Sequence, residues 1–590
     1  MTMTDPRPLW VALGCITALA HLGLIFYGLV PNLVSRPLHM ALLLPWVFLF
    51  PAKGARQVWF GAAIAVLGMA ACGWIAWNHA ALRDQYGFLE GDFQLWLAVF
   101  LLVLAIEGAR RMIGWPLPLV AAAMLAYGLF GQHIPGEFGH SGTPIRSFLG
   151  TLTITEGGLW GSLTGVSVGV VAIFVIFGAV LNAGEAGQGF MNVAAAAAGR
   201  LTGGAAKVSV LSSALFGSIS GSASANVAST GAITLPAMSR LGYPKRLAAA
   251  VEAVASSGGQ IMPPLMGAGA FVMVELTGVP YTEIMLAALL PALLYFFAVW
   301  IGIDAYATRF ELTGIPDSER PARRDVLVTS AFFLVPFGAL MLAMFALEFT
   351  PQYSASLAIL VGFLALFFDG KRGFSPAQGL TRAADAVFNA GRQIAMIGSI
   401  IVCASIVIGV LGITGLGVKL TSVIVAGSGG LLWPSLFLTA LACLLLGMEV
   451  PTTAAYVICV SVAGPALIEL GLQPIQAHLF VFWFALLSTI TPPVCGAVFI
   501  AAGMIGENWL KVALTAMALG IGLYLIPLGM IANPAIIELR TDVFAALLTL
   551  LQMAAGLAAL SFGLISRIAL PLRAALLAIG AGIIFWPAFL

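Results

Sequence analysis

The sequence predicts an all-α polytopic membrane protein, with about 14 to 16 transmembrane or re-entrant helical units. Two observations lead to this fold class. Of the 590 residues, 61% are hydrophobic and only 8% are charged, whereas soluble domains have roughly 25% charged residues. In addition, apolar runs long enough to cross a bilayer recur along the whole chain. The net charge of +2 and the lack of an arginine-rich arm argue against nucleic-acid binding.

The membrane spans follow from the apolar runs in chain order. The predicted spans are 10–30, 38–51, 57–78, 94–109, 113–131, 158–182, 284–307, 325–348, 352–369, 394–413, 431–447, 509–532, 542–565 and 568–590. A polar interval covers 132–157. Two regions, about 187–280 and 448–508, are apolar but are broken repeatedly by glycine, proline and serine. The first run continues to Val30, which predicts a retained span and not a cleaved signal peptide.

Basic residues predict the orientation of these spans. Loops on the cytoplasmic side of a membrane are enriched in lysine and arginine. This rule places the N-terminus in the cytoplasm and the 132–157 segment on the outer face. The cytoplasmic set comprises Arg7, Lys53, Arg56, Arg110, Arg111, the polar linker 309–324 and the loop 371–392 with Lys371, Arg372, Arg382 and Arg392.

The two broken regions repeat each other at an offset of 229 residues. Matching pairs are Pro236-Ala237 with Pro465-Ala466, Leu241-Gly242 with Leu470-Gly471, Pro263-Pro264 with Pro492-Pro493, Gly267-Ala268 with Gly496-Ala497, and Leu294-Tyr295 with Leu523-Tyr524. Prolines and glycines fix where helices break, and paired broken segments are the best sequence indication of a transporter's binding site. Five predicted spans separate the two regions, and this odd number predicts that their orientations are opposite.

A re-entrant hairpin is expected at 217–226, Gly-Ser-Ile-Ser-Gly-Ser-Ala-Ser-Ala-Asn. Its two apolar arms are too short to cross the hydrocarbon core, and backbone freed at such a tip is tolerated only where it is buried or lines a cavity. Free carbonyls with serine and asparagine oxygens suit a small cation such as Na⁺, and free N–H groups suit an anionic substrate. The alternative is that these small residues only allow close helix packing.

An unwound span is expected at Ser256–Pro264, because residues before proline disfavour helix; a simple kink is the alternative. The second region offers a matching tip at Gly447–Thr453 and a matching unwound segment at Ser488–Pro493. Acids inside a membrane are functional candidates by default. Glu449 at the second tip is therefore a possible proton carrier. Glu252 and Glu275 are further candidates, or else they lie near an interface or pair with Lys245 and Arg246.

The sequence gives little support for an enzyme. The six histidines form no HExxH pattern, and the first broken region, which holds Ser220 and Ser222, contains no histidine to serve as a base. A serine hydrolase is thus the less favoured reading. No Walker loop is present. A channel remains an alternative, although the broken regions carry few charges for a polar pore. The six cysteines form no CxxC pair, so no metal site is expected beyond one for Na⁺.

The motifs at 217–238 and 255–267 resemble the large permease subunit of tripartite ATP-independent periplasmic (TRAP) transporters. The resemblance is closest to the subgroup that works with TAXI-type binding proteins, in which fused small and large subunits are usual. It implies a small-subunit-like four-helix region at 1–114 and a large permease region at 115–535, with repeats at about 187–308 and 394–532. Two further helices are expected at 536–590.

The resemblance also implies a function. It implies an elevator mechanism and cation-coupled uptake, with Na⁺ the expected ion and H⁺ possible, of a small organic acid across the bacterial inner membrane. A periplasmic binding protein of the TAXI type would deliver the acid, and no cofactor is expected. An uptake carrier without a binding protein is the alternative.

The resemblance further implies site residues. The cation ligands would be Ser220, Gly221, Ser222, Asn226, Gly259, Gln260 and Met262 in the first repeat, and Val450, Thr452, Thr453, Ser488, Thr489 and Thr491 in the second. The substrate would lie near Ser222, Ser224, Asn226, Pro264, Thr453 and Pro493. Glu449 and Pro451 in the second tip depart from the first tip, which leaves room for H⁺ at that position.

Overall fold

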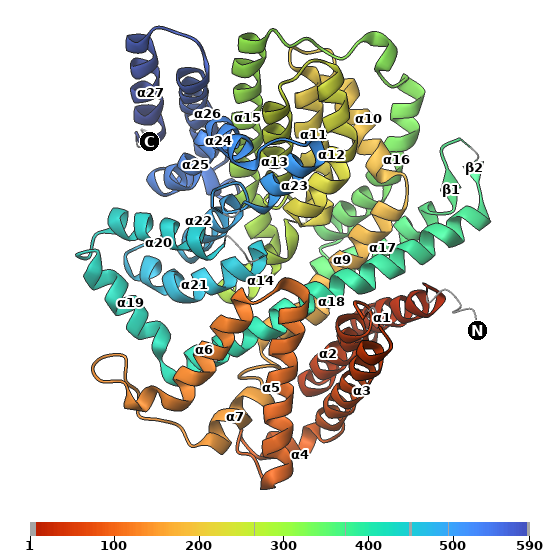
Figure 1. Cartoon of the computed structure of the whole chain (residues 1–590), viewed down its shortest axis with the longest axis vertical. Helices are drawn as coiled ribbons and strands as arrows, with labels where there is room; N and C mark the ends of the chain where they lie inside the picture. Colours follow the sequence, from red (N-terminus) through yellow and green to blue (C-terminus); the bar gives the residue numbers. More distant parts are fainter. Residues whose placement is uncertain are drawn as a thin grey trace. The chain divides into compact units, whose positions relative to one another are not determined.

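The computed structural model describes residues 7–52, 54–264, 266–371, 373–447, 451–493 and 495–586. The chain is almost entirely helical (Figure 1). In the described residues, the one sheet is the antiparallel pair β1 (Phe368–Asp369) and β2 (Gly373–Phe374). The helices form two compact units. Unit 1 contains the chain up to Ala183, Val335–Leu431 and Ser461–Ala466, and unit 2 contains Gly184–Leu334, Leu432–Val460 and Leu467–Leu590.

Unit 1 is built around the long helix α18 (Pro376–Thr414), which packs against α1, α2, α5, α6 and α9. Its other elements are α1 (Arg7–Tyr27), α2 (Asn32–Phe48), α3 (Ala55–Trp77), α4 (His79–Asp84), α5 (Gly91–Ile113), α6 (Pro116–Phe130), η1 (Gly131–His133), α7 (Ile145–Thr153), α8 (Ser162–Val166), η2 (Ser167–Val171), α9 (Ala172–Ala183), η4 (Leu342–Ala346), α17 (Pro351–Ala365) and α19 (Leu416–Gly427). Most of the predicted spans in this unit are found within a few residues of their expected bounds.

One expectation in unit 1 is wrong, and one helix was not predicted. The segment 371–392, expected to be a cytoplasmic loop, is helical from Pro376 onward, because α18 continues through it for 39 residues. Its charges misled the prediction, since they break the apolar run without breaking the helix. Arg382 pairs with Asp369 at 3.2 Å, and Asp385 pairs with Arg7. The gap between 413 and 431 also holds a helix, α19, which was not expected.

Unit 2 contains both broken regions and the C-terminal helices. Its elements are α10 (Ala186–Ala198), α11 (Gly204–Ser220), α12 (Ala223–Arg240), α13 (Lys245–Gly258), α14 (Gly267–Thr277), α15 (Tyr281–Phe310), η3 (Asp317–Glu319), α20 (Leu432–Leu446), α21 (Thr452–Glu469), α22 (Pro474–Leu487), α23 (Gly496–Ile505), α24 (Trp509–Leu519), α25 (Ile521–Ala532), η5 (Pro534–Ile537), α26 (Val543–Ile565) and α27 (Leu570–Phe585). α26 and α27 pack as a pair at the C-terminal end (Figure 1). Two helices belong partly to each unit. α16 (Arg323–Met341) belongs to unit 2 up to Leu334 and to unit 1 from Val335, and residues Ser461–Ala466 of α21 belong to unit 1.

The helices have the lengths that a membrane requires. Among the described residues, nine helices are long and apolar enough to span a bilayer, and the pair α24–α25, bent by 42°, makes a tenth. α11, α14, α20, α22 and α23 are apolar but shorter. Shorter apolar helices are common in re-entrant or broken spans. The polytopic all-α fold class is therefore confirmed.

The helix bounds confirm the internal repeat. α12 covers 223–240 and α21 covers 452–469, so both bounds differ by 229. The same difference separates α13 at 245–258 from α22 at 474–487, and the start of α14 at Gly267 from the start of α23 at Gly496. Each repeat thus has a short-armed helix pair followed by a helix that breaks before two prolines. The bonds Pro263–Pro264 and Pro492–Pro493 are both cis. Opposite orientation of the repeats stays a prediction.

Candidate cation and substrate site

The first tip lies between α11 and α12, where the sequence predicts a break. α11 ends at Ser220, and Gly221 then turns the chain with φ +60°, a conformation that favours glycine. Ser222 caps α12, since its hydroxyl accepts a hydrogen bond from the Ala225 N–H at 3.4 Å. The side chain of Ser220 lies outside the described part of the structure. The tip is therefore a tight turn between two helix ends, with freed backbone groups on either side.

Asn226 fixes this tip from the first turns of α12, where it is fully buried. Its Nδ2 donates to the carbonyl oxygens of Ser213 at 2.9 Å and Ser256 at 3.2 Å. Its Oδ1 is also buried and has no hydrogen-bond partner among the residues that the structure describes. Leaving a buried acceptor unpaired costs about 1–3 kcal/mol. Such an oxygen is therefore a candidate ligand for a cation, and it is one of the residues that the sequence singled out.

Glycines let α11 approach the end of α13 beside Asn226. A Cβ added to Gly217 would lie 2.3 Å from the Gly259 Cα and 2.7 Å from the Asn226 Nδ2. A Cβ added to Gly259 would lie 2.4 Å from the Gly217 Cα and 3.0 Å from the same nitrogen. These separations are shorter than real Cβ contacts. Any side chain at either position would therefore push the helices apart and displace the amide.

Gln260 connects the unwound part of the first repeat to both tips. This residue follows the end of α13, in the non-helical segment that precedes α14. Its Nε2 donates to the Gly221 carbonyl at 3.2 Å, and its Oε1 accepts from the Thr452 hydroxyl at 2.8 Å. Thr452 opens α21, at the end of the second tip. The buried amide of Gln260 thus joins two other predicted site residues, Gly221 and Thr452.

The second repeat supplies hydroxyl groups at the matching place. Ser488 donates to the Gly447 carbonyl at 3.0 Å. Thr489 hydrogen-bonds to Ser257 of the first repeat, with 2.9 Å between the two oxygens. Thr491 contacts the Tyr524 hydroxyl at 2.6 Å. Two residues of this tip that were proposed as a ligand and as a proton carrier, Val450 and Glu449, lie outside the described residues.

The other predicted site residues have no described contact with Asn226. Ser224 is exposed, and its Oγ would be 3.9 Å from a Cβ added to Gly496, at the start of α23. Pro493 is exposed, whereas Met262, Pro264 and Thr453 are half-buried. The structure therefore separates a buried group, with Asn226 and Gln260 at its centre, from a more open group that includes Ser224 and Pro493.

A polar cluster that was not predicted from the sequence surrounds Glu252, between α11, α12 and α13. Glu252 is fully buried and accepts hydrogen bonds from the hydroxyls of Ser209, Thr230, Thr234 and Ser256. The alternative that Glu252 pairs with Lys245 or Arg246 finds no support, because no such ion pair is present among the described residues. The other acid, Glu275, is exposed near the end of α14. The available signal was the four-residue spacing in Thr230/Thr234 and in Glu252/Ser256, which places each pair on one helix face.

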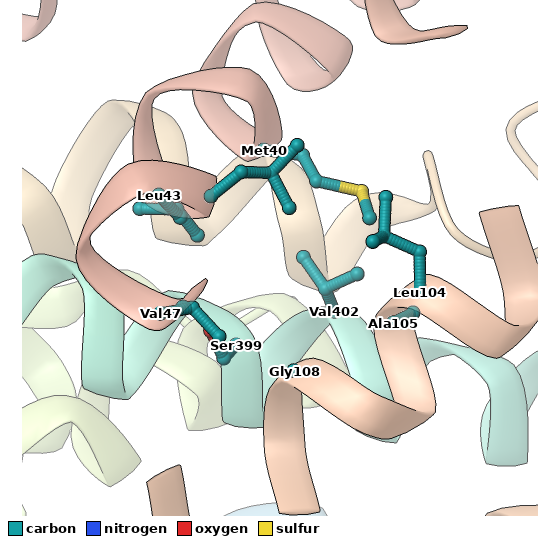
Figure 2. Close-up of a pocket in the computed structure, with 9 residues that line it drawn as sticks. Met40, Leu43, Val47, Leu104, Ala105, Gly108, Ser399 and Val402 are labelled. Carbon is teal, nitrogen blue, oxygen red and sulfur yellow. The ribbon is translucent and has the colours of Figure 1, made fainter. Parts of the chain in front are cut away.

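The described histidines offer no base for a serine at the tip. His478 hydrogen-bonds to the Tyr456 hydroxyl at 2.7 Å, and His21 pairs with His39 at 2.7 Å within unit 1. Unit 1 also holds a small pocket (Figure 2), whose labelled lining residues are Met40, Leu43, Val47, Leu104, Ala105, Gly108, Ser399 and Val402. This lining is apolar apart from the Ser399 hydroxyl, which donates to Ala395. It provides no charged group to recognise an acid.

Most of this chain matches a known family and several known proteins. The family model described as "Tripartite ATP-independent periplasmic transporter, DctM component" matches residues 98–542. The C4-dicarboxylate TRAP transporter large permease protein DctM of Pseudomonas aeruginosa is 26% identical over 346 residues, which cover 57% of this chain and 77% of that protein. The isethionate TRAP transporter permease protein DctMQ of Oleidesulfovibrio alaskensis is 24% identical over 442 residues, 71% of this chain and 68% of that protein.

A third relative covers a shorter part. The ectoine/5-hydroxyectoine TRAP transporter large permease protein UehC of Ruegeria pomeroyi is 24% identical over 230 residues, 38% of this chain and 49% of that protein. The family match covers well over half of the chain, which confirms the TRAP resemblance and excludes the hydrolase reading. Membership of the TAXI subgroup stays a prediction. The chain therefore belongs to the DctM family of TRAP transporters and is a multi-pass membrane permease.

Proposed function

We propose that this permease couples the uptake of a small organic acid to the inward movement of a cation across the bacterial inner membrane. A periplasmic binding protein of the TAXI type delivers the acid, and the N-terminus lies in the cytoplasm. The relatives support the substrate class, because their names specify a C4-dicarboxylate, isethionate and ectoine. No cofactor is needed beyond the coupling ion.

The unpaired Oδ1 of Asn226 carries the proposal for the cation. Oxygen ligands suit hard cations, and a carbonyl oxygen kept away from water is stabilised when it binds one. We assign Na⁺ to this position, with Asn226, Gly221 and Gln260 around it in the first repeat. Thr452, Ser488 and Thr489 form the corresponding part of the second repeat. H⁺ is the second candidate ion, and the buried acid Glu252 favours it.

The organic acid would occupy the more open group of residues. Ser222 and Ser224 lie at the N-terminal end of α12, and Thr453 lies at that of α21. Helix N-termini present free N–H groups and a partial positive charge to an anion. In the elevator mechanism that we propose, the two tips and the two unwound segments carry cation and acid together. Coupling follows because each ligand stabilises the same arrangement of tips and unwound helices.

Uptake by proteoliposomes tests this function. The purified permease is reconstituted with or without a candidate binding protein of the TAXI type. Labelled succinate, isethionate and ectoine are then offered under an inward Na⁺ gradient, an inward H⁺ gradient or no gradient. The proposal predicts that one of these acids accumulates only with a gradient and only with the binding protein. Gradient-independent flux would indicate a channel, and accumulation without the binding protein would indicate a stand-alone carrier.

A further inference from the structure

Glu252 is a buried acid without a positively charged partner among the described residues. Its carboxyl group lies between α11, α12 and α13, and each of its oxygens accepts two hydroxyl hydrogen bonds. Oε1 accepts from Thr230 and from Ser256 at 3.1 Å. Oε2 accepts from Ser209 at 2.7 Å and from Thr234. A charge buried without a counter-ion is costly, so this site calls for an explanation.

The charged groups on the surrounding helices do not supply that counter-ion. Lys207 on α11 pairs with Asp304 on α15 at 2.5 Å, and Arg240 on α12 pairs with Glu319 at 3.6 Å. The other charged or titratable side chains on α13 and the helices packed against it are Lys245, Arg246, Tyr281, Glu283, Tyr295, Tyr306, Arg309, His478 and Lys511. None of these has a described ion pair or hydrogen bond with Glu252, and Glu283 pairs with Arg540.

The internal repeat shows that the fold does not require this acid. On α12 and α13, positions 229 residues later in the chain are the structural counterparts, because the bounds of α12 and α21, and those of α13 and α22, repeat at that offset. The counterparts of Thr230, Thr234, Glu252 and Ser256 are Cys459, Ala463, Val481 and Ala485. All four polar side chains are replaced by less polar ones in the second repeat. The cluster is therefore a specific property of the first repeat and not a general feature of its architecture.

A proton fits this site better than a metal ion. The four hydroxyls already occupy both carboxylate oxygens, so few lone pairs remain for a metal. Hydroxyls both donate and accept, and these have other acceptors nearby. Thr230 Oγ1 is 2.8 Å from the Asn226 carbonyl, and Thr234 Oγ1 is 3.0 Å from the Thr230 carbonyl. A hydroxyl can thus turn away and accept from a protonated carboxyl without movement of the heavy atoms.

The same network reaches the tip. Ser256 donates to Glu252 through its hydroxyl and accepts from Asn226 through its carbonyl. Thr230 likewise contacts Glu252 and the backbone of Asn226. A positive charge near Asn226 therefore favours the ionised form of Glu252, while a protonated Glu252 weakens cation binding at the tip. By thermodynamic reciprocity these two effects are equal.

We propose that Glu252 is a proton-binding site linked to the cation position at Asn226. Protonation forms one O–H bond on a carboxyl oxygen with a proton taken from water, and release returns that proton to water. The linkage to the tip rests on the proposed function, whereas the binding of a proton by Glu252 does not. Na⁺ affinity should then rise with pH by up to about tenfold per pH unit below the titration midpoint.

Infrared titration of the purified protein tests the site. In Na⁺-free choline buffer, lowering the pH should produce a protonated-carboxyl band in the wild type that Glu252→Gln removes and the matched control Glu275→Gln retains. Thr234→Val keeps the acid but removes one donor to Oε2. Donors favour the ionised form, so this variant should move the midpoint of the band to higher pH. It also serves as the test if Glu252→Gln does not fold.

Addition of Na⁺ distinguishes the claim that Glu252 binds a proton from the claim that this proton is linked to a cation at Asn226. Na⁺ should move the Glu252 midpoint to lower pH in the wild type, and Asn226→Ala should abolish this movement. A band that titrates but does not respond to Na⁺ would remove the proposed cation position and leave the proton site intact. A wild type without a titrating band, a band that persists in Glu252→Gln, or a midpoint unchanged in Thr234→Val would overturn the proton site.

Discussion

At the scale of single residues, the candidate site depends on which polar atoms are paired. Asn226 donates both of its amide hydrogens to carbonyl oxygens, and these bonds aim its free Oδ1 away from them. Asn192 of the same unit is a useful contrast. Its Nδ2 donates to Thr329 at 3.0 Å, and its Oδ1 accepts from Gln188 at 2.9 Å. A buried asparagine is therefore not by itself a ligand, but one with an unpaired oxygen is a strong candidate.

The Gly217–Gly259 contact predicts a steric effect. Gly217→Ala should destabilise the protein by about 1–3 kcal/mol, the usual cost of overpacking, because its Cβ would lie 2.3 Å from the Gly259 Cα. Gly503→Ala on α23 is the matched control, since nothing lies within 4 Å of its added Cβ. Thermal unfolding of the purified variants measures both effects. Equal stability of the two variants would show that α11 and α13 do not cross so closely.

At the scale of helices and loops, prolines and glycines made the repeat predictable. The offset of 229 found in the sequence is the offset between the observed helix bounds, because these residues fix helix ends physically. Charge was a poorer guide. Arg382 and Asp385 suggested a loop, yet both lie in α18 and form ion pairs. A run of apolar residues in the sequence reveals a membrane span. It does not reveal that the helix continues beyond the span into a segment with charged residues.

The hydrogen bonds of the site could not be predicted from the sequence, because they join residues that meet only in the folded protein. The sequence named Asn226, Gln260 and Thr452, because they lie at breaks in apolar segments. It could not show that Gln260 would contact Gly221 and Thr452, since residues 221 and 452 are far apart in the chain. The hydroxyls around Glu252 were missed for the same reason. They lie on three different helices and converge only after those helices have packed.

The Gln260 bridge predicts coupling between the two repeats. A double-mutant cycle with Gln260→Ala and Thr452→Val should give an interaction free energy of about 1 kcal/mol, the usual contribution of one hydrogen bond. The free energy of unfolding of the wild type, the two single variants and the double variant provides the measurement. Strictly additive effects would mean that the 2.8 Å contact contributes nothing to stability.

At the scale of the whole molecule, the family match and the apolar helices identify a multi-pass permease. The orientation in the membrane is a separate prediction from the distribution of basic residues. Cysteine variants of two exposed loop residues test it. An impermeant thiol reagent applied to intact cells should label Glu137→Cys in the segment 132–157 and should not label Ser318→Cys in the polar linker.

Two controls make this labelling decisive. Permeabilised cells should show reaction at both positions, and the native chain sets the background, with five of its six cysteines buried and Cys15 partly exposed. Labelling of Ser318→Cys alone in intact cells would reverse the orientation. It would also move the proposed delivery of the acid to the other face of the permease.

The most direct test of the central claim is the binding of radioactive Na⁺ to the purified permease at fixed pH. We expect saturable binding in the wild type and in Asn192→Ala. In Asn226→Ala the affinity should fall by at least about tenfold, because a ligand bond to a charged group contributes about 1.5–3 kcal/mol. No saturable binding in the wild type, or equal affinity in the two variants, would contradict the assignment of Asn226 as a ligand of the coupling cation.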